Sequence, residues 1–178
     1  MADNRHLVPT CIIYIDGNRL NQAHEGALRS VKVFDKLNGI SECVISFDSS
    51  EQKLQNDNLT GFESLISIHL GYKDDMNEVF SGEITGRTIV LPEFGTEHFI
   101  VTGSSTLHRL GHALHSRVFE RKSPSEAIQR LVSFYDLQGE IDAFGRTIDY
   151  WEGGERTDLD LVLSLVRQHG RDIYTCTA

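Results

Sequence analysis

Hydrophobic and polar residues alternate along short segments of the chain as far as residue 103. A two-residue period places successive side chains on opposite faces of a β-strand, one face buried and the other in solvent. Segments with this pattern are Cys11–Ile15, Leu28–Asp35, Ser41–Phe47, Ser64–Tyr72, Val79–Ile84, Thr88–Leu91 and His98–Thr102. Their shortness and spacing are typical of an antiparallel barrel or sandwich. Asp16–Asn18 follows the first segment and predicts a tight turn in which Asn18 takes a positive φ.

The period changes to that of helices in the last third of the chain. Ser123–Glu126 predicts a helix start, with Ser123 as N-cap, Pro124 in the first turn and Glu126 completing a capping box. Thr157–Asp160 predicts a second start, with carboxylates in the first turn of a helix that begins at Asp158. The apolar stripes that follow are Ala127, Ile128, Leu131, Val132 and Tyr135, and then Leu159, Val162, Leu163 and Val166.

Three further segments are less regular. Leu107–Ser116 is compatible with a short helix, although Gly111 weakens it. Thr147–Trp151 and Asp172–Cys176 have the composition of strands. Because a strand at the end of the sequence leaves an open edge, we expect the chain to associate with other chains and to be the front part of a longer protein.

These patterns predict an α+β fold with two parts. Residues 1–103 are expected to form an N-terminal antiparallel β-barrel or sandwich, and residues 104–178 a small α/β segment with two helices that leads into a missing second barrel. Seven residues are expected to be buried because they lie on the apolar faces of these elements: Phe47, Ile68, Phe80, Ile128, Leu131, Val162 and Val166.

The net charge restricts the choice of partners. Seventeen Lys and Arg against 26 Asp and Glu give a formal charge of −9 over 178 residues. The charge is concentrated in residues 1–103, which carry a net −7. This charge argues against a general nucleic-acid binder, because an acidic surface repels the phosphate backbone. No apolar run is long enough to span a bilayer and the N-terminus lacks a secretory pattern, so we expect the chain to be made and folded in the cytosol.

The residues offer few candidates for chemistry. Three distant cysteines, Cys11, Cys43 and Cys176, encode neither a disulfide framework nor a zinc ribbon, and the common nucleotide, phosphate and hydrolase motifs are absent. His108, His112 and His115 would share one face of a continuous helix and could bind a metal there. No neighbouring carboxylate or cysteine completes the set, which favours a surface trio.

A glycosidase-type pair of carboxylates is the other catalytic possibility. Asp74, Asp75, Glu152 and Glu155 are available for it, but each lies in a polar or glycine-rich turn, where acidic residues are common. Tyr150 and Trp151 could stack on a sugar, although in a strand one ring of such a pair usually belongs to the core. Asn58–Thr60 matches a glycosylation sequon. We therefore predict no catalytic, cofactor-binding or metal-binding residues and no cofactor, with a carbohydrate-binding or lytic module as the alternative.

The order of several segments carries a family resemblance. Val79–Thr85 combines a phenylalanine, a small residue, glycine, an acidic residue, isoleucine and threonine. It is followed by Leu107–Phe119, by the capped start Ser123–Ile128, by Tyr150–Leu161 and by Val166–Gly170. In this order and spacing, from about Ile12 to Tyr174, the chain resembles the phage late control protein D group, which includes the VgrG spike proteins of type VI secretion and the hubs of extracellular contractile injection systems.

The resemblance implies a structural protein and not an enzyme. Hubs of this group are homotrimers in which two similar barrels per subunit form a ring of near sixfold symmetry, and they adapt a sixfold tail tube to a threefold spike. The implied partners are the tail tube protein, the spike protein and baseplate wedge proteins, with no membrane binding and no specific nucleic acid. The implied location is a virion tail or an injection-system particle assembled in the bacterial cytoplasm.

Overall fold

A computed structural model describes residues 9–48, 61–72, 75–91, 93, 95 and 97–175. The chain divides into two compact units. The first unit contains the residues up to Asp35 together with Ser41–Ser105, and the second contains Lys36–Ile40 and Thr106–Thr175. The fold is α+β and its sheets are antiparallel.

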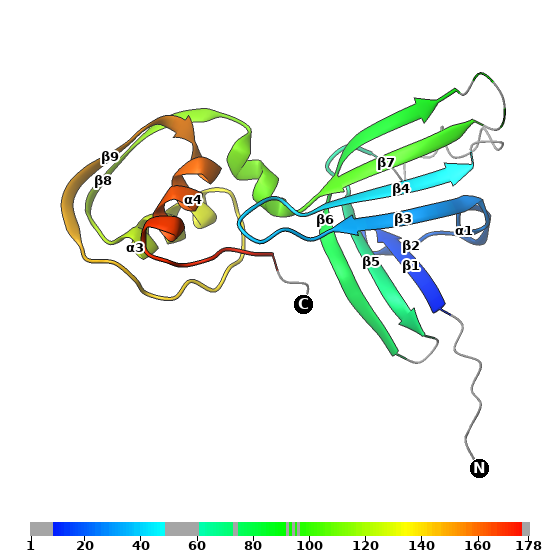
Figure 1. Ribbon diagram of the computed structural model, residues 1–178, viewed down its shortest axis with the longest axis horizontal. Coiled ribbons are helices and arrows are strands. Elements are labelled where there is room, and N and C mark those ends of the chain that lie inside the picture. Colours follow the sequence, from blue (N-terminus) through cyan, green and yellow to red (C-terminus); the bar gives the residue numbers. More distant parts are fainter. Residues whose placement is uncertain are drawn as a thin grey trace, which may run out of the picture. The chain divides into compact units, whose positions relative to one another are not determined.

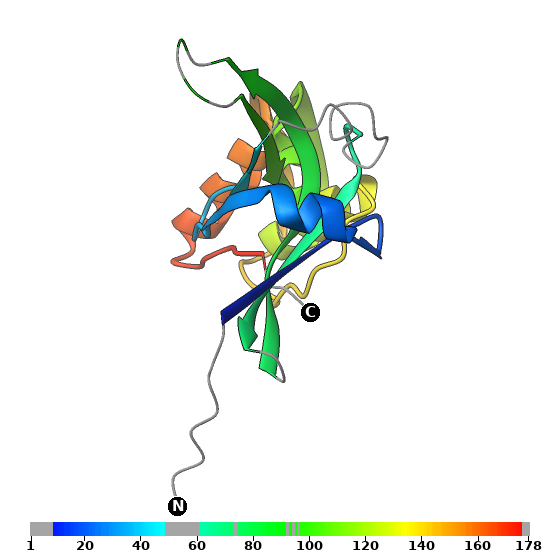
Figure 2. The same ribbon diagram turned by 90° about the vertical axis from the view of Figure 1, so that its right-hand side faces the viewer.

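The first unit is one antiparallel sheet that curls around a single core (Figure 1). Along the sheet the strands lie in the order β2-β1-β5-β6-β7-β4-β3. All seven strands belong to one hydrogen-bonded sheet, and residues of β1, β3, β4, β5, β6 and β7 contribute to one hydrophobic cluster, in agreement with the predicted barrel or sandwich. Helix α1 (Gln22–Ala27) connects the two end strands of this order (Figure 2). The strands are β1 (Pro9–Ile15), β2 (Asn18–Arg19), β3 (Leu28–Phe34), β4 (Glu42–Asp48), β5 (Leu65–Tyr72), β6 (Asp75–Val90) and β7 (His98–Ser104).

The alternating segments of the sequence are strands in the structure, with three corrections. The segments around Val79 and Thr88 belong to one continuous strand, β6, which pairs first with β5 and then with β7. Helix α1 was not predicted, because its six residues are too few to show a helical stripe. In the β1–β2 turn the positive φ angles are those of Asp16 and Gly17, at 49° and 75°, whereas Asn18 already lies in β2.

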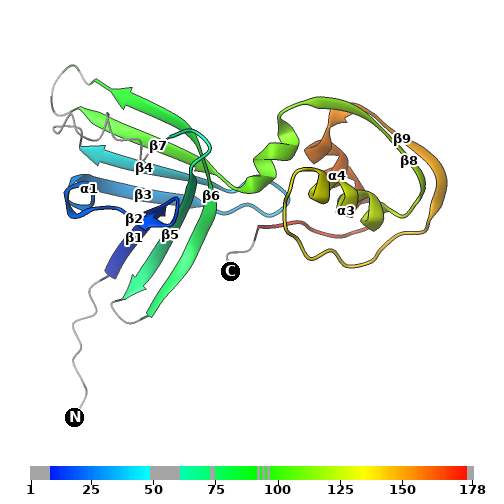
Figure 3. The same cartoon turned by 180° about the vertical axis from the view of Figure 1, so that it is seen from behind.

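The second unit is a two-stranded antiparallel sheet with two helices on its concave side (Figure 3). We call this sheet, formed by β8 (Leu114–Lys122) and β9 (Ile148–Thr157), the ribbon. The helices are α3 (Pro124–Phe134) and α4 (Asp158–Gln168), and a 3-10 helix, η2 (Thr106–Gly111), precedes β8. The core between ribbon and helices includes Leu110, Phe119, Ile128, Leu131, Leu161, Val162 and Val166.

Both predicted helix starts are confirmed. The Glu126 amide donates to the Ser123 hydroxyl at 3.3 Å, and the Ser123 amide donates to the Glu126 carboxylate at 2.7 Å, which completes the capping box. At α4 the Asp160 amide donates to the Thr157 hydroxyl at 3.0 Å. The sequence therefore determines these helix ends locally.

Two of the less regular segments differ from prediction. Leu107–Ser116 is not one helix, since η2 ends at Gly111 and β8 begins at Leu114. Residues 172–175 are not a strand. Instead, the backbone amide of Ile173 donates to the Asn38 side-chain oxygen at 2.9 Å, and the backbone amide of Asn38 donates to the Ile173 carbonyl at 2.8 Å. Cys176 lies outside the described residues.

The seven residues expected in the core are buried. Their exposed fractions do not exceed 4%, and they are Phe47, Ile68, Phe80, Ile128, Leu131, Val162 and Val166. Among the residues that the structure describes, no helix has the length and apolar character required to cross a bilayer.

Candidate functional site

A buried carboxylate is the centre of a polar cluster in the second unit. The side chain of Asp158 has no exposed surface. Arg117 donates to it twice, from Nε to Oδ1 at 2.9 Å and from Nη2 to Oδ2 at 2.6 Å. The Tyr135 hydroxyl donates to Oδ2 at 2.7 Å, and His115 Nε2 lies 3.9 Å from the same oxygen. We call these four residues the Asp158 centre.

The local sequence positions each member of the centre. Arg117 and His115 alternate with exposed residues along β8, so both point to the concave side of the ribbon. Tyr135 is the C-cap residue of α3, and Asp158 is the first residue of α4, where the helix dipole favours a negative charge. The centre therefore joins one strand to the end of one helix and the start of another.

The electrostatics of the centre favour a permanent ion pair. Burial raises the pKa of the Asp158 carboxyl, but the hydrogen bonds from Arg117 and Tyr135 and the charge of Arg117 outweigh it, so this pKa lies below its ordinary value of 3.8. The hydrogen bond to Asp158 raises the pKa of Arg117. Burial, together with the bond to Asp158, raises the pKa of Tyr135.

This arrangement suits cohesion better than catalysis. Both oxygens of Asp158 accept hydrogen bonds from the protein, and the carboxylate is closed to solvent, so it cannot take a proton from a substrate. The Arg117 guanidinium also lies 4.8 Å from the centre of the Phe134 ring, a cation–π distance that holds the side chain from a second side.

The three histidines do not form a shared metal site. His108 lies in η2 and His112 follows it, with ring centres 4.9 Å apart, whereas His115 lies in β8 and belongs to the Asp158 centre. Within the part of the chain that the structure describes, no group of three or more His, Cys, Asp or Glu could hold a metal ion. The break at Gly111 explains the separation, because it ends the helical spacing on which the trio depended.

The candidate carboxylates are also dispersed. Asp75 is in β6 of the first unit, while Glu152 and Glu155 are in β9 of the second. Asp74 and the sequon Asn58–Thr60 lie outside the described residues. Glu152 accepts a hydrogen bond from the Ser116 hydroxyl at 3.3 Å.

The aromatic pair of β9 divides between core and surface. Trp151 stacks on Phe119 with ring centres 4.7 Å apart, and its indole Nε1 is buried without a hydrogen-bond partner. Tyr150 is 59% exposed. The two rings therefore do not form one platform for a sugar.

The Val79–Thr85 segment has a packing role in the first unit. Phe80 and Ile84 enter the core and are 3% and 1% exposed. A Cβ at Gly82 would collide with the carbonyl oxygen of Ser104 in β7 and lie 2.9 Å from the Phe80 ring. Glycine is therefore required where β6 approaches β7.

The sequence matches the family model described as the Alg8 N-terminal domain over residues 5–177. The chain belongs to the Alg8 N-terminal domain family. No curated protein matches the sequence.

Three solved structures share the fold of this member of the Alg8 N-terminal domain family. The 43 kDa tail protein of prophage MuSo2 from Shewanella oneidensis superposes with a TM-score of 0.66 at 10% identity, over 92% of the chain and 49% of that protein. An E. coli component of the type VI secretion system, described as similar to the T4 bacteriophage tail proteins gp27 and gp5, gives 0.61 at 12%, over 86% and 42%. A tail protein from Neisseria meningitidis gives 0.62 at 9%, over 91% and 46%.

These likenesses show the fold, and the chain spans less than half the length of each of the three proteins. In this fold the Asp158 centre is the feature that sequence reasoning missed. Asp158 was recognised only as a first-turn carboxylate of a helix. The alternation of His115, Arg117 and Phe119 along β8 was the available signal for its partners.

Proposed function

We propose that the chain is a structural component of the baseplate hub of a contractile tail or contractile injection system, where three copies adapt a sixfold tail tube to a threefold spike. One observation carries the proposal. Two tail proteins and a type VI secretion component have a fold similar to that of this chain, with TM-scores of 0.61–0.66 over 86–92% of it.

The finer assignment within this class rests on sequence segments. The Val79–Thr85 and Thr157–Leu161 segments support membership of the late control protein D and VgrG group. In this proposal residues 1–103 are the hub barrel and residues 104–178 are an α/β segment that leads towards a second barrel. The partners are the tube protein, the spike protein and baseplate wedge proteins, and the location is a virion tail or an injection-system particle assembled in the bacterial cytoplasm.

A non-enzymatic role agrees with the state of the charged groups. The buried carboxylate of Asp158 accepts hydrogen bonds from Arg117 and Tyr135 at both oxygens and has no contact with solvent. A buried ion pair at the junction of three elements resists deformation of the unit. This property suits a part that transmits force between a tube and a spike.

Charge and symmetry supply further physical support. The net charge of −7 on residues 1–103 suits the wall of a channel through which an acidic polymer or a protein cargo slides without adhering. A ring that docks on both a sixfold and a threefold partner has to present surfaces compatible with both symmetries, and three subunits with two similar barrels each meet this condition.

Reconstitution with the tube protein of the same locus tests the proposal. We expect the full-length hub gene product to co-purify with that tube protein and to form a threefold ring at the end of a tube in electron micrographs. A tube protein from an unrelated tail is the specificity control and should not bind. A stable monomer that ignores both tube and spike proteins would overturn the proposal.

A further inference from the structure

One asparagine of a short loop holds the segment that follows α4. The loop, Lys36–Ile40, connects β3 to β4 and belongs to the second unit. The Asn38 side-chain nitrogen donates to Asp172 Oδ1 at 2.6 Å, and the side-chain oxygen accepts from the backbone amide of Ile173 at 2.9 Å. The backbone amide of Asn38 donates to the Ile173 carbonyl oxygen at 2.8 Å, so loop and segment lie side by side (Figure 1). We call these three hydrogen bonds the Asn38 clamp.

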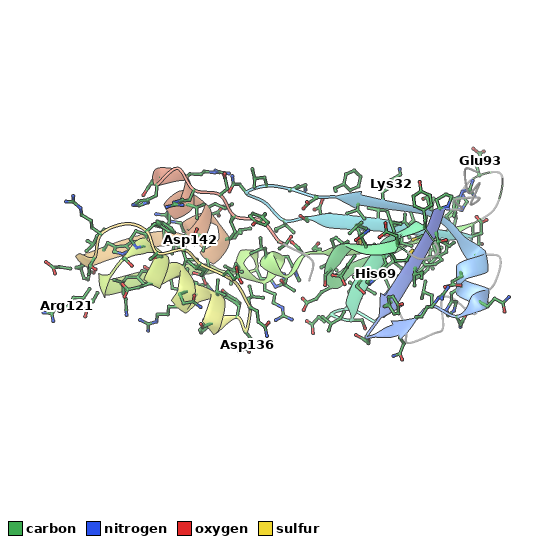
Figure 4. The ribbon with its side chains drawn as sticks, turned by 90° about the horizontal axis from the view of Figure 1, so that it is seen from below. Lys32, His69, Glu93, Arg121, Asp136 and Asp142 are labelled. Carbon is green, nitrogen blue, oxygen red and sulfur yellow. The ribbon has the colours of Figure 1, made fainter. Side chains whose placement is uncertain are left out.

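The other contacts of this segment are apolar or weak. Ile173 is partly buried against the hydrophobic core of the second unit. Arg171 lies 4.0 Å from Asp142, which is labelled in Figure 4, but the exposed fractions of these side chains are 51% and 91%, so the ion pair contributes little. Asp172 is exposed and accepts its hydrogen bond from Asn38. The Asn38 clamp therefore fixes the course of residues 172–173.

The residue after Asn38 is glycine, the neighbour that leaves an asparagine most open to deamidation. Gly39 has no side chain to keep its backbone nitrogen away from the Asn38 side chain. In this reaction the Gly39 nitrogen attacks Asn38 Cγ, and the bond from Cγ to the side-chain nitrogen breaks. That nitrogen leaves as ammonia and takes the proton of the Gly39 amide with it. Water then opens the succinimide ring to aspartate or isoaspartate, so water is the only other reactant.

The Asn38 clamp opposes this reaction in the folded chain. The nitrogen that leaves as ammonia is the one that donates to Asp172. The oxygen on the same Cγ is held by the backbone amide of Ile173. Ring closure therefore requires the clamp to open first, and the free energy of this local opening limits the rate.

The product of the reaction cannot rebuild the clamp. An aspartate at position 38 has no donor for Asp172 Oδ1, and it would place a second carboxylate where the donor now lies, at 2.6 Å. Like charges at such a distance repel each other. Isoaspartate additionally lengthens the backbone of the loop. An attractive contact thus becomes a repulsive one, and the loss of ammonia makes the change irreversible.

We propose that Asn38 is a deamidation site, that Asp172 and Ile173 protect it in the folded chain, and that its reaction releases residues 172–175 from the loop. Deamidation then marks each chain whose segment has opened. This chemistry belongs to the chain itself, so its tests do not depend on the proposed function.

Peptide mapping by mass spectrometry measures the protection during incubation of the full chain at mildly alkaline pH. We expect Asn38 to deamidate several-fold faster in Asp172→Ala than in the wild type. Asp172 is exposed, so its replacement weakens the clamp without disturbing a core. Glu140→Ala removes an exposed carboxylate elsewhere in the second unit and is the matched control, which should leave the rate unchanged. Equal rates in Asp172→Ala and the wild type would overturn the protection.

Gly39→Ala tests the chemistry separately from the clamp. A Cβ at Gly39 would lie 3.5 Å from the Lys36 side chain, an ordinary contact, so the loop accommodates the methyl group. Because this group hinders attack by the backbone nitrogen, it should slow deamidation of Asn38 in the Asp172→Ala background. An undiminished rate would show that ring closure through Gly39 is not the route.

Exchange of donor and acceptor tests the release of the segment. Asn38→Asp imitates the aspartate product and should speed hydrogen exchange at the backbone amide of Ile173, measured by NMR. Adding Asp172→Asn restores a complementary pair with the donor at position 172, so the double variant should return towards the wild-type rate. Unchanged exchange in Asn38→Asp would overturn the release, as would a double variant that exchanges as fast as Asn38→Asp. Circular dichroism of each variant verifies that its helices are intact.

Discussion

Arg117 holds Asp158 with two parallel hydrogen bonds, 2.9 and 2.6 Å long, across the junction of β8 and α4. The two residues are distant in the sequence, and their pairing joins the ribbon to α4, while the Tyr135 hydroxyl links the end of α3 to the same carboxylate. Bidentate pairs of this kind are among the strongest polar contacts in proteins, because both donors of the guanidinium fork match the carboxylate geometry. The packing of β8, α3 and α4 against one another therefore depends in part on the Asp158 carboxylate.

Removal of this carboxylate should destabilise the protein strongly. Asp158→Asn is expected to lower the free energy of unfolding by about 3 kcal/mol, because it leaves Arg117 without its counter-charge. The figure is at the lower end for a broken buried pair, since 24% of the Arg117 side chain reaches solvent. Urea denaturation measures it. Asp149→Asn, at an exposed position of β9, should stay within about 0.5 kcal/mol of the wild type.

Acid should weaken the same contact. The folded-state pKa of Asp158 is below the ordinary 3.8, so its stabilising contribution is present above that value and is lost as the pH falls through the lower folded-state pKa. Unfolding free energies measured from pH 6 downwards should therefore fall more steeply in the wild type than in Asp158→Asn. Parallel curves for the two proteins would show that the carboxyl is not held in its charged form.

Loss of the α3 cap should have a moderate cost. Ser123→Ala removes the hydroxyl that accepts a hydrogen bond from the Glu126 backbone amide. We expect the free energy of unfolding to fall by about 1 kcal/mol. Ser133→Ala, at an exposed position of the same helix, is the control and should be neutral or slightly stabilising. An unchanged denaturation midpoint for Ser123→Ala would argue that the helix begins elsewhere.

Two glycine substitutions should have opposite signs. Gly82→Ala should destabilise the first unit, because the new methyl group would meet the Ser104 carbonyl group and the Phe80 ring, 2.9 Å away, and neither can move without disturbing the sheet. Gly26→Ala places the same group in open space within α1 and should stabilise by a few tenths to about 1 kcal/mol. Thermal melting of the two variants compares them directly. Equal melting temperatures would contradict the close approach of β6 and β7.

The Cys43 thiol should be inert in the folded protein. Burial raises its pKa to about 12, although the Gly103 backbone opposes this slightly, and its exposed fraction is 0%. An Ellman assay at pH 8 should leave Cys43 unmodified until denaturant is added, because the reactive thiolate is not populated. Cys11, which is only partly buried, should react sooner. Rapid labelling of Cys43 in the native protein, followed by peptide mapping, would contradict the closed core.

The sequence alone was sufficient where local rules decide the structure. Alternation placed Phe47 and Ile68 in the core of the first unit, because a strand with one buried face has only one phase that hides its apolar residues. The capping residues Ser123 and Thr157 set the starts of α3 and α4, because each satisfies backbone amides within its own turn. These features depend on neighbours within a few positions.

Tertiary structure decided whatever depends on distant partners. β6 is continuous because it changes partner from β5 to β7 along its length, and residues 172–175 leave the strand conformation because Asn38 binds Ile173 instead. The Asp158 centre forms only when β8 brings Arg117 to the ends of both helices, an arrangement that no local period encodes. The sequence by itself thus determined most of the elements and their buried faces. The pairing of Arg117 with Asp158 was decided by tertiary packing, because only the packed elements bring the two charges together and remove the carboxylate from water.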